Sequence, residues 1–595
     1  MAKKTWQKKL LCVIVAAAMV IMFIPMIAFA DGNVAEVDGT GYTTVQEAID
    51  NGNGKTVKLL ADVSENITID ADTTVTLDLN SFKITNAAAS HTIINKGILT
   101  IQGSGTVDNI NHACAALWNE GTAVLNGGTF DRSKDAGSSA EASGNNSYYT
   151  IVNHGTMTIY DGVAVTQPGK YSSLLENGWY NGADNNSGED SLLTIEGGTF
   201  SGGLNTIKND DYGKLIIKGG NFTNVAQAAL LNWNEAEITG GTFEADETST
   251  CVVLNGYLND TMDAGKLTIS GGTFTGGEGT DAINTMGGSS SSGDIDISGG
   301  EFNGDIVLGN GNKAGGTLNI SGSAVINGNV SNTNMDNITI SGGSVSGTVS
   351  NTGAGTTEIT GGAFAVQPSS DLVSDNAAMA SYTKSGEDAA TYYVGADTIS
   401  EAVKDAADGD SIEVISGDVS LDIMNGGVTV TNKGDGNVTV NDTEIAKDES
   451  TTTHTHEYSY KYDENGHWQE CSCGDKTEVE AHTFGEWIID KEATAVEAGS
   501  KHRECSVCGY SETEVIAATG TSSDSSSSSD SNSSSSNSSS TSSGSGSASS
   551  DTSSVAQPQT GENGSVVMWA FIAVLAIGGV SAFLFTQRKK FVSGK

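Results

Sequence analysis

A short phrase of alternating apolar and polar residues recurs along the middle of the chain. A run of three to five β-favouring residues is followed by two glycines and a second short run, as in LTIEGGTF (193–200), AEITGGTF (236–243) and LTISGGTF (267–274). Further copies are AVLNGGTF (123–130), LIIKGGNF (215–222), IDISGGEF (295–302), ITISGGSV (338–345) and TEITGGAF (357–364). Alternation with a period of two indicates strands with two different faces, and glycine pairs permit tight corners. Because the phrase returns about every 20–30 residues without a helical pattern between copies, the sequence predicts stacked coils of β-strand.

Asparagines form a second periodic feature between the glycine pairs. Asn tolerates left-handed backbone, and its amide both donates and accepts hydrogen bonds. Stacked at one corner of successive coils, these amides would form a hydrogen-bonded ladder; the alternative is that they are ordinary turn residues. The predicted ladder positions are Asn95, Asn119, Asn153, Asn177, Asn209, Asn232, Asn255, Asn284, Asn310, Asn332 and Asn351.

This strand-and-turn repeat resembles the right-handed parallel β-helix of pectate-lyase-like proteins. The resemblance covers about residues 34–380 and implies an all-β solenoid, which with its N-terminal cap is predicted to span residues 31–380. Near its start, Thr44 and Glu47 fit a capping box, which predicts a short helix that closes the open end of the first coil. The same pattern returns at 398–403, so residues 381–447 are predicted to form a short β-rich module that begins as the solenoid begins.

The first 30 residues have the layout of a secretory signal peptide. Basic residues from Lys3 to Lys9 precede an apolar run, and Ala28 and Ala30 supply the small residues that a signal peptidase requires. A secreted chain is therefore expected. The alternative is an uncleaved membrane anchor, since the apolar run is about 20 residues long.

Residues 556–595 combine three elements in a fixed order. The motif QPQTG at 557–561 is followed by an apolar stretch at 566–585 and then by a basic tail. An apolar stretch of this length predicts a transmembrane helix. The order of the three elements resembles the LPxTG-like sortase signal of Gram-positive cell-wall proteins.

This resemblance implies that a sortase reads Pro558, Thr560 and Gly561, cleaves between Thr560 and Gly561, and joins Thr560 to peptidoglycan. The departure from the family pattern is Gln557, which stands where the pattern has Leu. The alternative is a plain C-terminal membrane anchor. The Ser-rich tract before the signal, residues 519–555, cannot bury a core and predicts a disordered stalk.

The charge of the chain excludes one class of partner. Lys and Arg number 29 against 73 Asp and Glu, a net charge of −44. Such a surface repels phosphate backbones, so nucleic acid is excluded, and it suits a solvated extracellular protein. The expected partners are peptidoglycan, through the sortase, and host or environmental glycans.

Aromatic and acidic residues gather in and around the longest insertions of the repeat. Insertions on one face of a solenoid are often its binding surface. Aromatic faces beside carboxylates suit sugar binding, and the alternative is that the rings merely pack the loops onto the solenoid. The candidate ligand-binding residues are Trp179, Tyr180, Asp210, Asp211, Tyr212, Trp233 and Tyr257.

Three functions are open at this point. The first is an adhesin or glycan-binding solenoid on the cell surface; the second is a polysaccharide lyase or glycoside hydrolase; the third is a spacer without a ligand. A hydrolase needs two carboxylates at a suitable gap, and Arg is scarce between the termini, with only Arg132 and Arg503. No catalytic residue is assigned. A convergent cluster of three or more carboxylates with a nearby Lys would favour an enzyme, and an open aromatic strip would favour binding.

Residues 448–518 differ in composition from the rest of the chain. The segments HWQECSCG (467–474) and HRECSVCG (502–509) are near duplicates, and each ends in a Cys-rich turn followed by Gly. The module resembles Cys/His repeats near the C-termini of Gram-positive surface proteins, which implies a structural role. Elsewhere, Cys114 and Cys251 stand beside or within apolar runs and are predicted to be buried thiols.

The thiols of the module predict a structural zinc site, with the ligand set left open. One ion could be shared by all four thiolates, or each copy could hold its own ion with histidines completing the sites. The alternative is two local disulfides or free thiols, since the compartment is oxidising. The candidate ligands are Cys471, Cys473, Cys505 and Cys508, with His456 or His467 and His482.

Overall fold

The computed structural model describes residues 32–137, 147–180, 182–256, 265–285, 293–309, 316–334, 336–472 and 474–520. The predicted signal peptide, the sorting signal with its transmembrane helix, and all but the first two residues of the predicted stalk lie outside these ranges. Within them, no helix combines the length and the apolar character needed to cross a membrane. The chain divides into two compact units, Met1–His454 and Thr455–Lys595, which are described separately.

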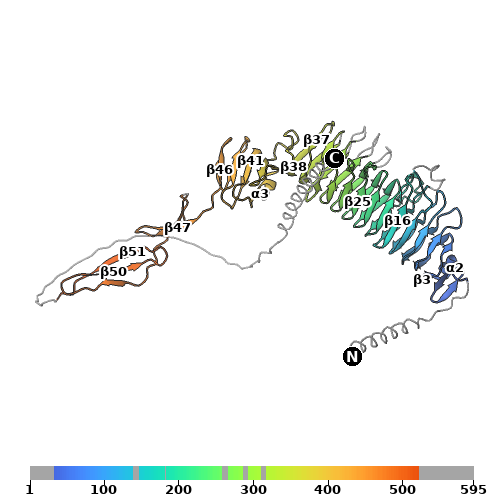
Figure 1. Ribbon diagram of the computed structural model, residues 1–595, viewed down its shortest axis with the longest axis horizontal. Helices are drawn as coiled ribbons and strands as arrows, with labels where there is room; N and C mark the ends of the chain where they lie inside the picture. The colour runs from blue at the N-terminus through green and yellow to red at the C-terminus, as the bar shows by residue number, and fades with distance from the viewer. Residues whose placement is uncertain are drawn as a thin grey trace, which may run out of the picture. The chain divides into compact units, whose positions relative to one another are not determined.

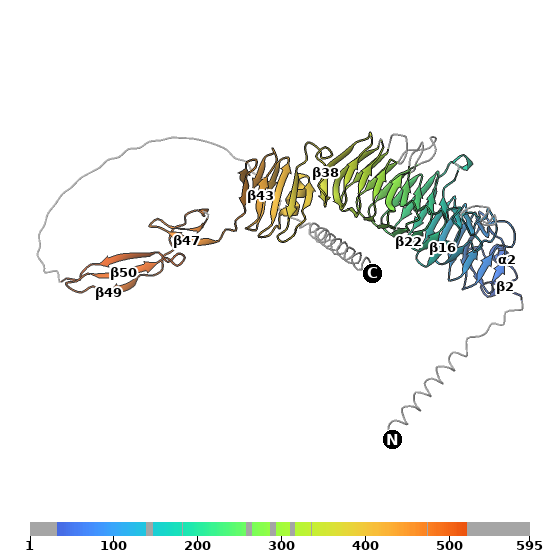
Figure 2. The same cartoon turned by 45° about the horizontal axis from the view of Figure 1, so that its top comes forward.

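The first unit is built around a parallel β-solenoid in which a typical coil contributes three strands (Figures 1 and 2). One coil consists of β18 (Ser191–Ile195), β19 (Thr199–Gly202) and β20 (Asn205–Asn209). Each strand pairs in parallel with its counterpart in the next coil, so three stacks of strands run along the solenoid. The predicted all-β solenoid is confirmed, while its right-handed winding stays a prediction.

The strands that the structure describes fall into the three stacks as follows. The first contains β3 (Lys55–Leu59), β6 (Thr74–Asp78), β9 (Ile98–Gln102), β12 (Thr122–Leu125), β15 (Thr156–Ile159), β18, β21 (Gly213–Ile217), β24 (Glu235–Ile238), β27 (Lys266–Ile269), β30 (Asp294–Ile297), β33 (Thr317–Ile320), β36 (Asn337–Val345) and β38 (Thr357–Phe364). The second contains β4 (Val63–Ser64), β7 (Lys83–Thr85), β10 (Thr106–Asp108), β13 (Gly128–Asp131), β16 (Val163–Gln167), β19, β22 (Asn221–Asn224), β25 (Thr242–Ala245), β28 (Thr273–Gly276), β31 (Glu301–Asn303) and β34 (Val325–Ile326), and it is continued by the ends of β36 and β38. The third contains β5 (Ile67–Ile69), β8 (Ile93–Asn95), β11 (Leu117–Asn119), β14 (Ile151–Asn153), β17 (Leu175–Asn177), β20, β23 (Ala228–Asn232), β26 (Cys251–Asn255), β29 (Asp281–Thr285), β32 (Ile306–Leu308), β35 (Val330–Asn332) and β37 (Val349–Asn351).

The glycine pair of the repeated phrase forms the corner between the first two stacks. Gly241 has a φ of +103°, a conformation that L side chains rarely adopt. A Cβ on Gly240 would collide with the carbonyl oxygen of Lys218 in the preceding coil. The pair therefore supplies one positive φ and one close approach of backbone to backbone.

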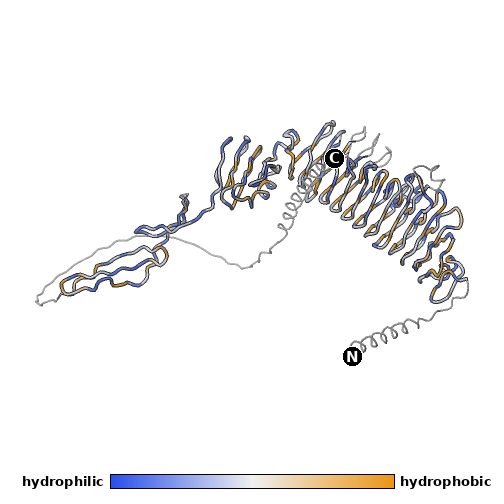
Figure 3. Tube along the Cα trace, viewed as in Figure 1, coloured by the Kyte–Doolittle hydropathy of each residue, from blue (hydrophilic) through white to orange (hydrophobic). Residues whose placement is uncertain are grey.

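Phenylalanines that follow the glycine pairs form a row inside the solenoid. Consecutive rings stack at centroid distances of 4.6–4.8 Å, which matches the spacing between neighbouring strands. Figure 3 shows apolar and polar residues alternating along the coils, as expected when one side of each strand faces the core. The fully buried members of this phenylalanine row are Phe200, Phe222, Phe243, Phe274 and Phe302.

The predicted asparagine ladder is confirmed over seven successive coils of the third stack. Each amide Nδ2 donates to the Oδ1 of the next asparagine at 2.7–2.9 Å, and every side chain in the series is buried. The members are Asn95, Asn119, Asn153, Asn177, Asn209, Asn232 and Asn255.

The ladder prediction is wrong at Asn284. The residue opposite Asn255 in β29 is Thr285, and Asn284 lies opposite Leu254. A shift of one residue moves a side chain to the other face of the sheet, and the Asn284 amide donates to Asp281 instead.

The remaining predicted ladder positions extend no amide chain among the described residues. Asn310 lies outside the described ranges. Asn332 and Asn351 are in register, but their amides donate to the backbone carbonyls of Asp336 and Gly355.

A short helix covers the N-terminal end of the solenoid. In α2 (Val45–Asn51), the Thr44 hydroxyl accepts a hydrogen bond from the Glu47 backbone N–H at 3.1 Å, as the capping box predicts. Two short strands, β1 (Ala35–Val37) and β2 (Thr40–Tyr42), pair antiparallel beside it, β1 also pairing with β3.

The predicted second β-rich module begins with antiparallel strands and a helix. β40 (Thr391–Val394) pairs with the end of β38 and with β39 (Met379–Thr383), which runs across the predicted boundary at residue 380. The helix α3 (Ala396–Val403) follows, as the repeated cap pattern predicts. The other strands are β41 (Ser411–Ser416), β42 (Val419–Leu421), β43 (Thr429–Asn432), β44 (Val438–Val440), β45 (Thr443–Ile445) and β46 (Ser450–Thr452), and together these elements enclose an apolar core of their own.

The second unit contains a hairpin and a small antiparallel sheet. The hairpin is β47 (Tyr458–Tyr462) with β48 (His467–Cys471), and the sheet is β49 (Ile488–Lys491), β50 (Gly499–Glu504) and β51 (Ser511–Ile516). The buried residues within the described part of this unit are two glycines and three side chains, His467, Cys471 and Cys505. The unit therefore has no apolar core of ordinary size among its described residues.

Candidate functional sites: an aromatic pocket and a His/Cys cluster

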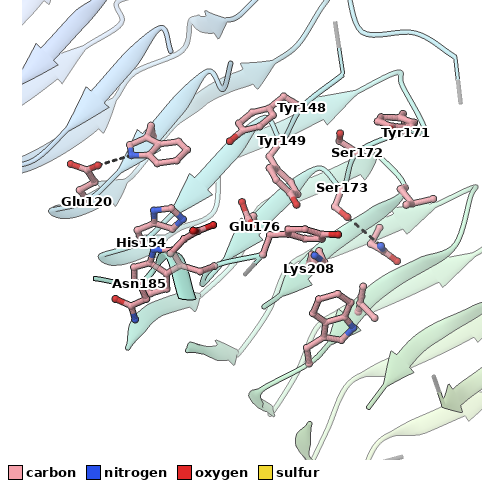
Figure 4. Close-up of a pocket in the computed structure, with 18 of the residues that line it drawn as sticks. Glu120, Tyr148, Tyr149, His154, Tyr171, Ser172, Ser173, Glu176, Asn185 and Lys208 are labelled. Atoms are coloured by element: carbon pink, nitrogen blue, oxygen red, sulfur yellow. Dashed lines mark hydrogen bonds between the residues drawn. The ribbon is translucent and has the colours of Figure 1, made fainter. Parts of the chain in front are cut away.

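A pocket of about 1030 Å³ lies on the outer face of the third stack. Its lining includes Trp118 of β11, Glu176 of β17, Lys208 of β20 and Leu231 of β23. Each of these residues immediately precedes a ladder asparagine. Neighbouring residues along a strand point to opposite faces. The ladder asparagines point into the solenoid, so these four lining residues point outward. Figure 4 shows Glu176 and Lys208 side by side on adjacent coils, as their register requires.

The loop after β17 forms one wall of the pocket. The Trp179 backbone N–H donates to the Asp211 carbonyl oxygen at 2.9 Å, and the Gly182 N–H donates to Asp211 Oδ2 at 2.8 Å. These two bonds tie the loop to the next coil. They hold Trp179 and Tyr180 at the pocket, where Tyr180 is 67% exposed.

Aromatic rings from successive coils form a row along the pocket. The centroids of His91 and Trp118 are 4.5 Å apart, those of Trp118 and His154 are 4.7 Å apart, and those of His154 and Trp179 are 4.6 Å apart. The Tyr212 ring lies edge-on to Trp179 at 6.2 Å. Burial lowers the pKa of both His91 and His154 to about 4. The row therefore consists of uncharged rings at neutral pH.

Lys208 supplies the positive charge of the pocket. Its side chain is almost buried, and its Nζ lies 2.8 Å from Asp210 Oδ2. The same ammonium lies over two aromatic faces, 4.4 Å from the Tyr180 centroid and 4.1 Å from the Trp233 centroid. A desolvated ammonium between rings and a carboxylate is held firmly in place.

Glu176 and Asp210 lie close together beneath the pocket. Burial raises the pKa of Glu176 well above its usual range, and the nearby charge of Asp210 adds to this rise. Burial raises the pKa of Asp210 too, although Lys208 opposes that rise. Burial and the charge of Glu176 also raise the pKa of the neighbouring Tyr149 phenol. The raised pKa of Glu176 favours its protonated form.

The predicted ligand-binding residues take different places in this site. Trp179, Tyr180 and Trp233 line the pocket, although Trp233 is only 7% exposed and packs against Leu231 and its neighbours. The other predicted positions lie beneath or behind the lining, or outside the described residues: Asp210 under Lys208, Asp211 as the tether of the loop, Tyr212 behind Trp179, and Tyr257 outside the described ranges.

Several lining residues were not identified from the sequence. Their position next to a ladder asparagine in the sequence would have identified them. The residue before or after each ladder asparagine lies on or near the outer face. This applies to Trp118, His154, Glu176 and Lys208, while Tyr148 and Tyr149 come from the segment before β14.

The second unit contains a cluster of four candidate metal ligands. One ligand atom from each of His467, His482, Cys505 and Cys508 lies within 4.8 Å of the others. Burial opposes ionisation of Cys505, but backbone N–H groups of Cys508 and Val507 outweigh it and lower the pKa of this thiol to about 6. Two thiols and two imidazoles are a donor set that suits tetrahedral zinc.

The structure divides the predicted zinc ligands between two groups. Cys505 and Cys508 lie with His482, as one alternative predicted, and also with His467 from the other copy. Cys471 lies outside this cluster in a group with His456, and Cys473 lies outside the described residues. Cys505 and Cys508 are free thiols, and the described Cys114 and Cys251 are buried thiols as predicted.

Comparison with known proteins gives limited similarity. No family model matches this chain, and no solved structure matches it. The adhesin BmaC autotransporter of Brucella suis biovar 1 (strain 1330) is 26% identical over 317 residues, which cover 48% of this chain and 9% of that protein. This chain thus spans less than a tenth of the length of the curated relative. The similarity to an adhesin and the β-solenoid fold are both compatible with a surface adhesin.

Proposed function

We propose that this protein is a surface adhesin that binds glycans through the pocket on the third stack. The observation that carries the proposal is the row of uncharged rings, Trp118, His154 and Trp179, beside hydrogen-bonding groups in one pocket. Aromatic faces accept the apolar faces of sugar rings, while the surrounding polar groups bond to hydroxyls. The similarity to an adhesin supports the same class of function.

The charges of the pocket favour a neutral glycan over a polyanionic one. Lys208 is already matched by Asp210, and burial raises the pKa of Glu176, which favours its uncharged form. Glu120 and Asp184 add carboxylates to the lining, and the chain as a whole has a net charge of −44. A polyuronate would meet repulsion with no unpaired cation in the described lining to offset it.

Replacing Trp179 with alanine is expected to weaken glycan binding about tenfold. Aromatic stacking contributes about 0.5–1.5 kcal/mol beyond buried area, and 1.4 kcal/mol corresponds to a factor of ten. A glycan array identifies the ligand, and titration calorimetry then compares the variant with Tyr160→Ala, which removes an exposed ring outside the pocket. Equal affinity in all three proteins would show that the pocket is not the binding site.

Glycan cleavage is a second candidate function, because Glu176, Asp210 and Asp211 gather near Lys208. A buried carboxyl group with a raised pKa, such as that of Glu176, has the character of a general acid. Asp210, however, is fully buried and paired with Lys208, so it is not exposed as the second carboxylate that glycoside hydrolysis requires. Binding is therefore the better-supported function. If the unaltered protein produced new reducing ends in the glycans that it binds, and the Glu176→Gln variant did not, cleavage would become the better-supported function.

The attachment of the protein to the cell wall is proposed from the sequence. The signal at Pro558, Thr560 and Gly561 would join the chain to peptidoglycan after secretion, with residues 519–555 as a stalk. Thr560→Ala is expected to move the protein from the wall fraction to the membrane or the medium, as followed by immunoblotting of fractionated cells. Thr552→Ala, in the stalk, is the matched control. Unchanged wall attachment of Thr560→Ala would contradict a sortase mechanism.

The His/Cys module is proposed to bind structural zinc. Its described part buries almost nothing besides candidate ligands, so it lacks the apolar core with which a unit of this size folds unaided. Metal binding supplies folding free energy in such units.

A further inference from the structure

His467 is the strongest sign of a missing ligand in the second unit. Its side chain is 3% exposed, and neither ring nitrogen has a hydrogen-bond partner. The Glu480 carboxylate lies 3.8 Å from its Nε2, which is beyond hydrogen-bond distance, and is itself largely exposed. Burying an imidazole with two unsatisfied nitrogens costs free energy unless something binds it.

Three further donors converge on the same point from different segments. Cys505 and Cys508 come from the turn after β50, and His482 comes from the chain between β48 and β49. The His482 Nε2 lies 2.8 Å from the Asp463 carbonyl oxygen, so it donates there and leaves Nδ1 toward the thiols, 3.4 Å from Cys508 Sγ. A second hydrogen bond that fixes the tautomer in this way is typical of metal-ligating histidines.

The spacing of the four donors fits a tetrahedral ion. Zinc bonds of about 2.0–2.3 Å place neighbouring ligand atoms roughly 3.3–3.8 Å apart. The four atoms lie within 4.8 Å of one another, so small side-chain movements suffice. Gly509, with a φ of +75°, follows Cys508 and allows the tight turn that presents both thiols.

We propose that one zinc ion is bound by His467, His482, Cys505 and Cys508 and joins the β47–β48 hairpin to the β49–β51 sheet. This inference rests on the proposed zinc binding and names its ligands. It crosses the sequence duplication, because His467 belongs to the first copy and the two thiolates to the second. Cys471 takes no part in this ion.

The ion would replace an apolar core as the link between the two halves of the unit. Without it, ring contacts such as Tyr462 with Tyr510 still join the two parts, but His467 stays buried without a hydrogen-bond partner beside two free thiols. Removal of zinc is therefore expected to unfold the described part of the unit while leaving the solenoid folded, because the solenoid has its own large core.

The test measures zinc in the full chain, purified in detergent under reducing conditions, by elemental analysis. His467→Gln and Cys508→Ser are each expected to lose one equivalent of zinc relative to the unaltered chain. Two matched controls are expected to keep that equivalent: His502→Gln, a histidine paired with Asp490 outside the cluster, and the double variant Cys471→Ser/Cys473→Ser. His502→Gln is the decisive control, because a second ion at the group around Cys471 would be lost from the double variant as well.

A second measurement keeps the inference testable if a variant fails to fold. In the unaltered chain, Cys505 and Cys508 are expected to resist alkylation until a chelator is added, and cobalt substitution is expected to give the absorption of a two-thiolate, two-nitrogen site. Loss of zinc in Cys471→Ser/Cys473→Ser with full retention in His467→Gln would overturn the ligand set while leaving zinc binding intact. Absence of zinc, with the module thiols paired as disulfides in mass spectra, would overturn both.

Discussion

Replacing Phe243 with alanine is expected to lower the free energy of unfolding of the solenoid by about 3–5 kcal/mol. The ring is fully buried and stacks on Phe222 at 4.6 Å and on Phe274 at 4.8 Å. Removing it leaves a cavity between two coils that the row cannot close, since its neighbours are fixed by strand pairing on both sides. Chemical denaturation of the purified chain, followed by circular dichroism, measures the change.

Glu244→Ala is the matched control for this variant. It alters the next residue of β25, whose side chain is exposed on the opposite face, and it is expected to change stability by less than about 0.5 kcal/mol. If Phe243→Ala cost no more than this control, the phenylalanine row would contribute nothing to the cohesion of the coils.

Replacing Asn232 with leucine is expected to destabilise the solenoid by about 1–3 kcal/mol, because buried amide groups lose their partners. Its Oδ1 accepts from Asn209 at 2.9 Å, and its Nδ2 donates to Asn255 at 2.8 Å and to the Lys266 carbonyl at 3.0 Å. The side chain is completely buried, so water cannot replace these bonds. The melting temperature of the variant reports the loss.

An exposed amide pair provides the control for this ladder variant. Asn327 donates to Asn303 at 2.8 Å between neighbouring coils, but both side chains are open to solvent to a much greater extent. Asn327→Leu therefore breaks the same kind of bond where water can satisfy the partner, and little change is expected. Equal melting temperatures for Asn232→Leu and the unaltered chain would contradict a stabilising role for the ladder.

The local pattern predicted the coils because strand and corner depend on neighbouring residues. The phrase LTIEGGTF becomes β18, a corner at Gly197 and Gly198, and β19. Alternation alone places Leu193 and Ile195 in the core. The ladder asparagines were predicted for the same reason, and the error at Asn284 shows the limit. Spacing locates a corner within a residue or so, whereas the face of a side chain changes with every residue.

The pocket could be predicted only in part, because its residues belong to many different coils. Trp179 and Tyr180 stood out in a long insertion, but Trp118 and Lys208 lie ninety residues apart and meet only through strand register. The position of Glu176 opposite Lys208 could not be predicted from the sequence either. Its register opposite Lys208, and the burial that raises its pKa, depend on how insertions of different length place one coil above the next.

The sequence by itself therefore determined the repeating architecture, the existence of an asparagine ladder and the kinds of residue able to bind metal or sugar, since each depends on local composition and period. Only the tertiary structure decided which residues meet. It placed the rings of three coils in one row, buried Glu176 beside Asp210 and thereby raised its pKa, and grouped His467 with Cys505 and Cys508 across the duplication. The physical reason is the same in each case: a side chain's partners across coils and hairpins are set by strand register and packing, which no single repeat contains.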